Sequence, residues 1–499
     1  MVYAFLIVMK SGKAIDADED TDRIMDNSNF LKEENKMERR EKLLFWCVLL
    51  LNAIIFFAGL GSFQISQAYM DSVSNGEYSF LSDEEELFPE ELTYYYRTMF
   101  DEVLYAGSAY EFLQGEVMYE ETHPPMGKIL IALGVSVFGL SPFGWRVVSA
   151  LFGLGMLPFV YWFLHKLFRD RRAALLGMTL LSLDFMHYTL SRIGTLDSIV
   201  AFFILATFAM LWEVFERIGK DIQAKPAKPA WSLLAFMMFH ALIIGMGVSC
   251  KWTGFYAMAG AAVCFLVFWV KNMRKAAKNG NVRSYLVKLL VEAVLIYSLI
   301  PLAVYVISFL PQTIAQGEYN VWKVMWDSSL QMLEYHDSIV FEHSYSSEWY
   351  TWIWNKRPLL DAANILQNGK VSLVVTMGNP ILWWCGIVSV FHMAYRFLVK
   401  KDSKAGYLLA AYLFMLVPWM FVKRTVFIYQ YYASSIFMIC ALSYSLSILG
   451  QKQKKAVPIF IEVTLCVFLM FFPILSGLPI NGSYVQKFLQ WLPDWNFIL

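Results

Sequence analysis

The feature that most constrains this chain is a series of long apolar stretches separated by short charged segments. A helix needs about 20 mostly apolar residues to cross a bilayer. Only 16% of the residues are charged, whereas soluble domains average roughly 25%. This excludes a disordered chain, a coiled coil and an ordinary soluble enzyme. The pattern predicts an all-α polytopic membrane protein with about eleven spans, near 43–63, 144–167, 173–190, 194–216, 231–249, 253–271, 286–309, 378–398, 405–422, 426–449 and 456–475.

Basic residues gather in alternate short segments, beginning just before the first span. Because lysine and arginine mark cytoplasmic loops, this predicts a cytoplasmic N-terminus and an extracytoplasmic C-terminus. Two long segments, about 64–143 and 310–377, then fall outside as large extracytoplasmic loops. Residues 2–9 are apolar but too few to span, and residues 10–42 are polar and rich in both charges, so we expect 1–42 to be a disordered cytoplasmic segment and 43–499 to form one membrane domain. Basic and acidic residues balance at 41 each, which gives no sign of nucleic-acid binding.

The first outer loop holds two segments that suggest chemistry. Asp101 and Glu102 are adjacent carboxylates, which could provide a general base or form a solvated acidic face. Further on, His123 precedes two prolines, and Lys128 opens a short apolar stretch that suits the membrane interface. Lys128 could hold a lipid phosphate, or it could lie at a helix end with its ammonium in water.

Charged residues also occupy the tight outer turns between spans. Arg146, Arg192, Asp197, Lys251 and Arg424 lie where the topology rule asks for no positive charge. Charges at such depths are costly and suggest function. Several cations together could bind a phosphate, or each could pair with an acidic residue of a loop.

The second outer loop combines Glu348 with Trp349 and Trp352. These tryptophans could stack on a sugar or belong to an interfacial aromatic belt. His336-Asp337 in this loop lies in no HxxxH or HExxH spacing, and the six cysteines form no CxxC pair. The sequence therefore predicts no metal site.

Eight motifs in order resemble the protein O-mannosyltransferases of glycosyltransferase family 39, over about residues 95–435. They are FDE, HPPMGK, WR, RIGTLD, GMGVSCKWTGFY, SSEWYTWIWNKRP, GNPILWW and KRTVFIYQYY. The resemblance implies a GT-C membrane fold, a polyprenyl- or dolichyl-phosphate mannose donor, and serine or threonine acceptors on translocated proteins. It implies Asp101 as catalytic base beside Glu102. Arg146 resembles the family arginine ahead of the second span, and motif positions also match at His123, Lys128, Arg192, Asp197 and Lys251.

The chain differs from the eukaryotic members of this family in two places. It lacks the MIR insertion in the second outer loop, so it resembles a bacterial type that resides in the cell membrane. Where the family has tyrosine-histidine-tyrosine, this chain has Tyr429-Gln430-Tyr431. Both differences bear on how the acceptor and the sugar are recognised.

A lipid-phosphate sugar suggests a simple mechanism. Cations stabilise the departing phosphate, and one carboxylate takes the proton of the acceptor hydroxyl. One base and one leaving group suit a single inverting displacement, and this scheme requires no nucleotide or metal cofactor. The expected partners are the donor, exported Ser/Thr proteins, membrane lipid and a protein-export machinery.

Two other functions stay open on the sequence alone. A related GT-C enzyme could move another lipid-linked sugar or use a lipid or glycan acceptor, because sugar contacts leave no readable motif. A transporter of lipid-linked sugars would usually show repeated halves and helices interrupted at mid-membrane. We see no repeated halves, and the unusual residues gather at one membrane face.

Overall fold

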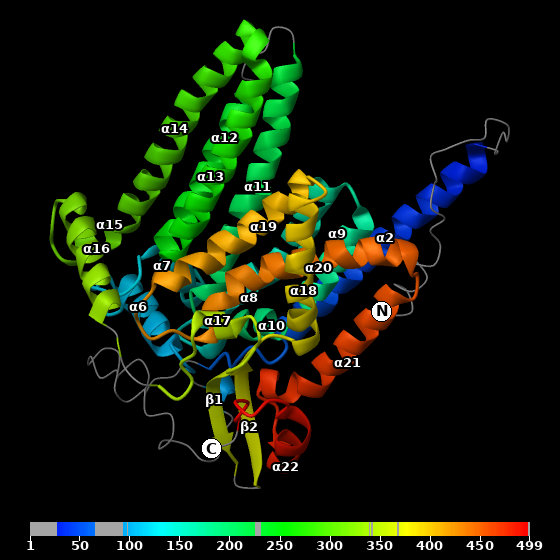
Figure 1. The fold of residues 1–499 in the computed structure, drawn as a ribbon. Helices are drawn as coiled ribbons and strands as arrows, with labels where there is room; N and C mark the ends of the chain where they lie inside the picture. Colours follow the sequence, from blue (N-terminus) through cyan, green and yellow to red (C-terminus); the bar gives the residue numbers. More distant parts are fainter. Residues whose placement is uncertain are drawn as a thin grey trace.

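The computed structural model describes residues 27–64, 93–96, 98–224, 231–338, 340, 343–366 and 369–497 (Figure 1). Within these ranges, nine helices are long and apolar enough to cross a membrane. This confirms an integral membrane protein. The helices of these spans are α8 (Pro142–Phe168), α11 (Asp197–Gln223), α12 (Trp231–Cys250), α13 (Thr253–Lys275), α14 (Gly280–Ser308), α18 (Pro380–Leu398), α19 (Ser403–Leu416), α20 (Tyr432–Lys452) and α21 (Ala456–Ser476).

The first predicted span, 43–63, lies only partly in α2 (Asn27–Phe57), which begins well before it, and α2 is not among the nine. Part of the segment that we expected to be disordered is therefore helical. Good helix formers and the i,i+4 pair of Glu38 with Lys42, at 3.0 Å, account for this correction. The remainder of that prediction, residues 1–26, lies outside the described residues.

The third predicted span is two short helices, α9 (Arg171–Ser182) and α10 (Phe185–Leu190). Asp184 interrupts them, and its buried carboxylate caps α10. The same carboxylate accepts hydrogen bonds from the Asn379 backbone N–H at 3.1 Å and from Trp383 Nε1 at 2.9 Å. A buried aspartate thus breaks the helix and anchors the start of α18. Since neither half is long enough to span alone, the count of eleven is not confirmed.

Helix α11 lies at the centre of the bundle and contacts α8, α12, α13 and α20. Of its most apolar stretch, 89% is buried inside the protein, against 22% for α13. Apolar side chains gain little by leaving lipid, so membrane helices depend on close packing. Gly260 of α13 permits such packing, because a Cβ there would lie 2.8 Å from Phe414 of α19. The short helix η1 (Ala276–Lys278) joins α13 to α14.

The two long segments that we predicted as outer loops supply most of the short elements. The first loop contains α5 (Thr93–Tyr96), α6 (Glu102–Gln114) and α7 (Met126–Phe138), and α7 is too short to span. The second contains α15 (Leu310–Ala315), α16 (Val321–Ser338) and α17 (Trp349–Trp352). Two further turns, η2 (Val417–Phe421) and η3 (Ile428–Tyr431), lie between α19 and α20.

The all-α prediction needs one correction, because the second loop also forms a β-hairpin. Strands β1 (Leu359–Ile365) and β2 (Lys370–Thr376) pair antiparallel, and β3 (Ile480–Asn481) adds to β2. Valine-rich β2 favours a strand and buries six of its seven residues. The C-terminal segment, with α22 (Gly482–Tyr484) and η4 (Val485–Leu489), packs beside this sheet at one end of the molecule (Figure 1).

Candidate active site

Asp101 lies in a tight turn immediately before α6. Phe100 has a φ of 50°, a left-handed conformation that is uncommon for a phenylalanine. Asp101 occupies the N-cap position but makes no side-chain capping hydrogen bond. The residue is half-buried, and within the described residues its carboxylate accepts no hydrogen bond and forms no ion pair. The turn therefore presents a carboxylate that is available for chemistry.

Glu102, the next residue, has the opposite environment. Its fully buried carboxylate accepts two hydrogen bonds from the Arg146 guanidinium, from Nε and Nη2, each at 2.6 Å. It also accepts from the backbone N–H groups of Gly194 at 2.6 Å and Met99 at 3.0 Å. We call Met99, Glu102, Arg146 and Gly194 the buried node. This node joins the FDE, WR and RIGTLD motifs and fixes the turn that carries Asp101.

The buried node revises what Arg146 and Glu102 were expected to do. Both side chains are 0% exposed, and Arg146 Nη1 also donates to the Leu60 carbonyl at 3.0 Å. This geometry favours positioning of Asp101 over direct contact with donor phosphate or acceptor. Gly194 is required by close approach, since a Cβ there would lie 2.8 Å from both the Trp145 ring and its carbonyl oxygen.

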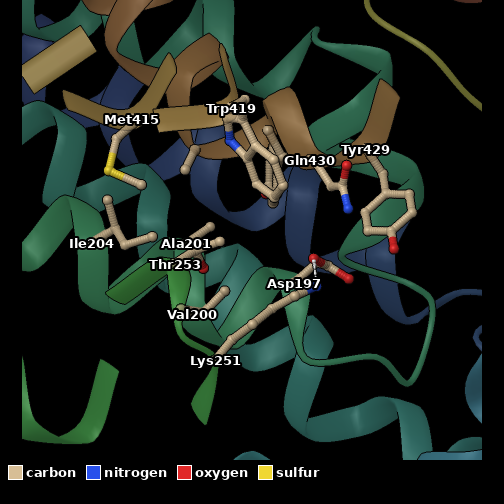
Figure 2. Close-up of a pocket in the computed structure, with 12 residues that line it drawn as sticks. Asp197, Val200, Ala201, Ile204, Lys251, Thr253, Met415, Trp419, Tyr429 and Gln430 are labelled. Atoms are coloured by element: carbon tan, nitrogen blue, oxygen red, sulfur yellow. Dashed lines mark hydrogen bonds and ion pairs between the residues drawn. The ribbon is translucent and has the colours of Figure 1, made fainter. Parts of the chain in front are cut away.

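A second ion pair lines a pocket between α11, α13 and the turn before α20. Lys251 Nζ donates to Asp197 Oδ1 at 2.8 Å and lies 5.2 Å from the centre of the Tyr429 ring. Figure 2 shows this pair facing Tyr429 and Gln430 across the pocket. The other lining residues are mostly apolar: Val200, Ala201, Ile204, Thr253, Met415, Trp419, Tyr432 and Ala433. One end of the pocket is thus charged and the rest suits an apolar chain.

The electrostatics of Asp101 connect it to this pocket. The pKa of the Asp101 carboxyl is raised to about 7, mainly because burial disfavours its charge; Lys251 and Arg424 oppose this rise, while the Asp197 and Glu120 anions add to it. A general base works best when its pKa lies near the operating pH. Asp101 therefore has the protonation behaviour that proton abstraction near neutral pH requires.

A third cluster holds the HPPMGK segment together. Lys128 is 1% exposed, and its ammonium donates to Glu120 Oε2 at 2.7 Å and to the His123 carbonyl at 2.8 Å. The ammonium also donates to the backbone carbonyl of Glu120, so all three of its N–H donors are used. His123 Nδ1 bonds to Glu120 Oε1 at 3.0 Å. The ammonium of Lys128 and the Nδ1 of His123, two residues predicted to bind the donor, are therefore engaged within this cluster.

The groups of this cluster shift the pKa values of one another. Burial alone would raise the pKa of Glu120. The Lys128 ammonium and the His123 ring instead hold this pKa well below its usual range. Burial lowers the pKa of His123 in spite of that carboxylate. Glu120 thus remains an anion and fixes the backbone of the segment.

Arg192 ties helix α10 to the end of the first predicted span. Its guanidinium donates to the Tyr188 hydroxyl at 2.7 Å and to the Gly59 carbonyl at 2.6 Å. It also lies over the Tyr188 ring, 5.0 Å from the centre. Of the five basic residues predicted to bind donor, the one that lines the pocket of Figure 2 is Lys251.

In the second loop, Glu348 is exposed and Trp349 is half-buried, so both are accessible to an acceptor. Trp352 is 0% exposed, donates from Nε1 to the Ser347 carbonyl at 3.0 Å and packs on Trp419. The direct sugar contact expected of Trp352 is therefore not available. It supports Trp419, which lines the pocket.

Four residues near the site were not among those singled out for it: Glu120, Trp419, Tyr429 and Gln430. Tyr429 and Gln430 lie inside a motif, and their place in KRTVFIYQYY was the available signal. Gln430 Oε1 accepts from the Phe427 backbone N–H at 3.1 Å. Across the part of the chain that the structure describes, no three His, Cys, Asp or Glu residues are grouped so that they could hold a metal ion.

The fold and the site define a class: a polytopic membrane glycosyltransferase with GT-C architecture and its polar site at one end of the spans. Residues 138–314 match the family "Dolichyl-phosphate-mannose-protein mannosyltransferase". Residues 321–495 match the "C-terminal four TMM region of protein-O-mannosyltransferase". The chain belongs to the protein O-mannosyltransferase family.

Similar proteins and structures agree with this assignment. The polyprenol-phosphate-mannose–protein mannosyltransferase of Mycobacterium tuberculosis is 24% identical over 456 residues, covering 80% of this chain and 86% of that protein. Its Corynebacterium glutamicum counterpart is 24% identical over 431 residues, covering 75% and 81%. The Saccharomyces cerevisiae Pmt1-Pmt2 complex bound to the sugar donor shares the fold, with a TM-score of 0.71 at 14% identity and coverage of 92% and 93%.

Proposed function

We propose that this protein transfers mannose from a polyprenyl-phosphate mannose donor to serine or threonine hydroxyls of proteins, with inversion at the anomeric carbon. The observation that carries the proposal is the position of Asp101. Its carboxylate has no hydrogen-bond or ion-pair partner among the described residues, and the charges of Lys251 and Asp197, which line the polar end of an apolar pocket, act on it. The names of the mycobacterial relatives indicate the same donor and a protein acceptor.

Asp101 acts as the general base in this scheme. The acceptor oxygen attacks the anomeric carbon as its proton passes to the Asp101 carboxylate, while the bond from that carbon to the phosphate oxygen breaks. Desolvation of Asp101 increases its basicity. One base with one departing phosphate is the arrangement of a single displacement, which inverts the sugar.

Lys251 stabilises the phosphate that leaves. Its ammonium lies at the charged end of the pocket, where Asp197 holds it in place at 2.8 Å. The apolar residues of the pocket, such as Ile204 and Met415, suit the first units of a prenyl chain. A fixed cation at the departing oxygen lowers the barrier, because it needs no reorganisation during the reaction.

The orientation follows from which end of each helix carries the site. Helix α11 begins at Asp197 and has Lys220 in its last turn, whereas α13 begins beside Lys251 and ends with Arg274 and Lys275. The site and the basic turns are therefore at opposite ends of these spans. By the positive-inside rule, the site faces the extracytoplasmic side of the cell membrane, with the N-terminus cytoplasmic.

This orientation determines the partners. An acceptor must reach the outer face, so a protein-export machinery is a candidate partner, and the exposed Glu348 with Trp349 is a candidate acceptor contact. The scheme uses the lipid-linked sugar as substrate and calls for no nucleotide or metal cofactor.

The test is a donor and acceptor comparison in membranes that contain the protein. We expect radiolabel to pass from polyprenyl-phosphate mannose to an exported peptide rich in serine and threonine, and not to its alanine counterpart. Polyprenyl-phosphate glucose is the matched donor control. Transfer from the glucose donor, or to lipid instead of peptide, would replace the proposal with another GT-C activity.

A further inference from the structure

Gln430, in the short helix η3, is a buried glutamine whose side-chain amide is fixed by the backbone. Its Oε1 accepts a hydrogen bond from the Phe427 N–H at 3.1 Å, and its own backbone N–H donates to the Phe427 carbonyl at 3.2 Å. A backbone N–H can only donate, so the side-chain atom that meets it must be the oxygen. The orientation of the amide is therefore determined, and its nitrogen, with two N–H donors, points away from Phe427.

The amide nitrogen of Gln430 faces the pocket. The residue is 8% exposed and is one of those that line this pocket. Figure 2 shows the nitrogen on the side of Asp197 and Lys251, with the oxygen turned away from them. Within the described residues, no protein atom accepts a hydrogen bond from this nitrogen. Donors held in a pocket without an acceptor cost free energy, so an occupant that supplies an acceptor oxygen is stabilised there.

A second buried glutamine shows the satisfied form of the same arrangement. Gln312 of α15 is 4% exposed, and its Oε1 also accepts from a backbone N–H, that of Met118, at 3.2 Å. Its Nε2 donates to the Glu121 carboxylate at 3.0 Å. Both glutamines thus brace a backbone N–H with the oxygen, but Gln312 also has an anionic acceptor in the protein for its nitrogen. The comparison favours an anionic oxygen of the substrate as the acceptor for Gln430.

The charges of the pocket show what a neutral donor adds. Lys251 and Asp197 form an ion pair at 2.8 Å, so together they bring no net charge to the pocket. A phosphoryl group presents several strong acceptor oxygens, and an ammonium that already serves a carboxylate has at most two N–H donors left for them. The amide of Gln430 supplies two more donors without a further buried charge that would need its own counter-ion.

We propose that Gln430 is a donor-binding residue, whose amide nitrogen donates a hydrogen bond to a non-bridging phosphoryl oxygen of the lipid-phosphate sugar, beside Lys251. The inference rests on the proposed function for the class of donor. The phosphate gains negative charge as its bond to the anomeric carbon breaks, so donors already in place stabilise the departing group without reorganisation. The hydrogen bond from Phe427 keeps the amide in this orientation throughout.

Two substitutions separate binding from the structural role of the side chain. Gln430→Glu keeps an oxygen for the Phe427 N–H but loses both N–H donors and adds a charge, whereas Gln430→Met loses the oxygen and the donors and adds no charge. The probe is radiolabelled undecaprenyl phosphate, bound to purified protein in nanodiscs and corrected for the folded fraction. We expect its dissociation constant to rise about tenfold or more in both variants, since a hydrogen bond to a charged group is lost. The unfolding midpoint should fall in Gln430→Met alone.

Two controls are matched to this experiment. Gln312→Glu makes the same chemical change in a glutamine that does not line the pocket of Figure 2. It places a carboxylate against Glu121, so the unfolding midpoint should fall while the folded protein binds undecaprenyl phosphate as the wild type does. Undecaprenol, which has the same chain without the phosphate, is the matched ligand. We expect the wild type and both Gln430 variants to bind it equally.

Wild-type affinity for undecaprenyl phosphate in either Gln430 variant would overturn the proposal. If Gln430→Glu kept that affinity, the side chain would serve only to brace Phe427, and if only Gln430→Met kept it, the loss in Gln430→Glu would come from the added charge. An equal loss of affinity for undecaprenol would also overturn it, because the phosphate would not be the group that Gln430 binds. A wild type that binds undecaprenyl phosphate but transfers no mannose would defeat the proposed function alone, since the binding constants would still decide the role of Gln430.

Discussion

The two adjacent carboxylates of this protein lie in contrasting surroundings. Asp101 is half-buried, its carboxylate accepts no hydrogen bond within the described residues, and the charges of Lys251 and Asp197 act on it. Glu102 is fully buried and accepts four hydrogen bonds, two of them from Arg146. A carboxylate with every lone pair engaged is a poor base but a strong anchor. A rigid buried node therefore holds the turn, while the neighbouring residue remains free to react.

The largest expected effect comes from removing the reactive carboxylate, that of Asp101. Asp101→Asn keeps the shape of the side chain but cannot accept the proton, so transfer at saturating donor should fall by about 10³-fold, since general-base catalysis supplies roughly 10²–10⁴. The amount of folded protein and its unfolding midpoint should not decrease, because the substitution removes a desolvated charge. Retention of more than a tenth of the wild-type rate would exclude Asp101 as the base.

The next largest effect comes from removing the anchoring carboxylate, that of Glu102. Glu102→Gln leaves the Arg146 guanidinium buried without its counter-ion, which should cost about 3 kcal/mol of stability and lower the thermal unfolding midpoint. A double variant with Arg146→Met should recover part of this loss. If Glu102→Gln abolished transfer while leaving stability unchanged, Glu102 would take part in the chemistry instead.

A smaller effect distinguishes Lys251, which lines the pocket, from Lys128, which does not. Lys251→Met should raise the KM for donor about tenfold, since losing one charge-assisted hydrogen bond costs roughly 1.5 kcal/mol. Lys128→Met is the matched control, because Lys128 is committed to Glu120 and His123. It should reduce stability and leave the donor KM unchanged. The reverse result would move the phosphate site to the HPPMGK segment.

The sequence identified most of the residues that the structure brings together, but it could not assign their partners. The FDE, WR and RIGTLD motifs all predicted function, yet Glu102 meets Arg146 and Gly194 only through folding, across 44 and 92 residues. A lone arginine at a membrane face looks the same in sequence whether it binds phosphate or a buried glutamate. Arg146 and Lys128 illustrate this, because both are paired with buried glutamates, whereas Lys251 lines a pocket beside Asp197.

The spans were predictable because hydropathy depends on local composition, and the nine described spans match predicted ones. The helix break at Asp184 was not predictable. A single aspartate in an apolar stretch gives no sign that Asn379 and Trp383 will bind it and break the helix. The hairpin of β1 and β2 was also missed. Its strands lie in a loop whose other motifs are helical, and β2 is completed by β3 from the far end of the chain.

The pH dependence of single-turnover mannose transfer by the wild-type protein tests the central claim most directly. A carboxyl whose folded-state pKa is raised to about 7 is protonated below that pH and active above it. We predict that the rate rises about tenfold per pH unit below pH 7 and levels off above it. A rate that stays constant between pH 5.5 and 8.5, or that begins to fall only near the ordinary aspartate pKa of about 4, would contradict a desolvated Asp101 as the base.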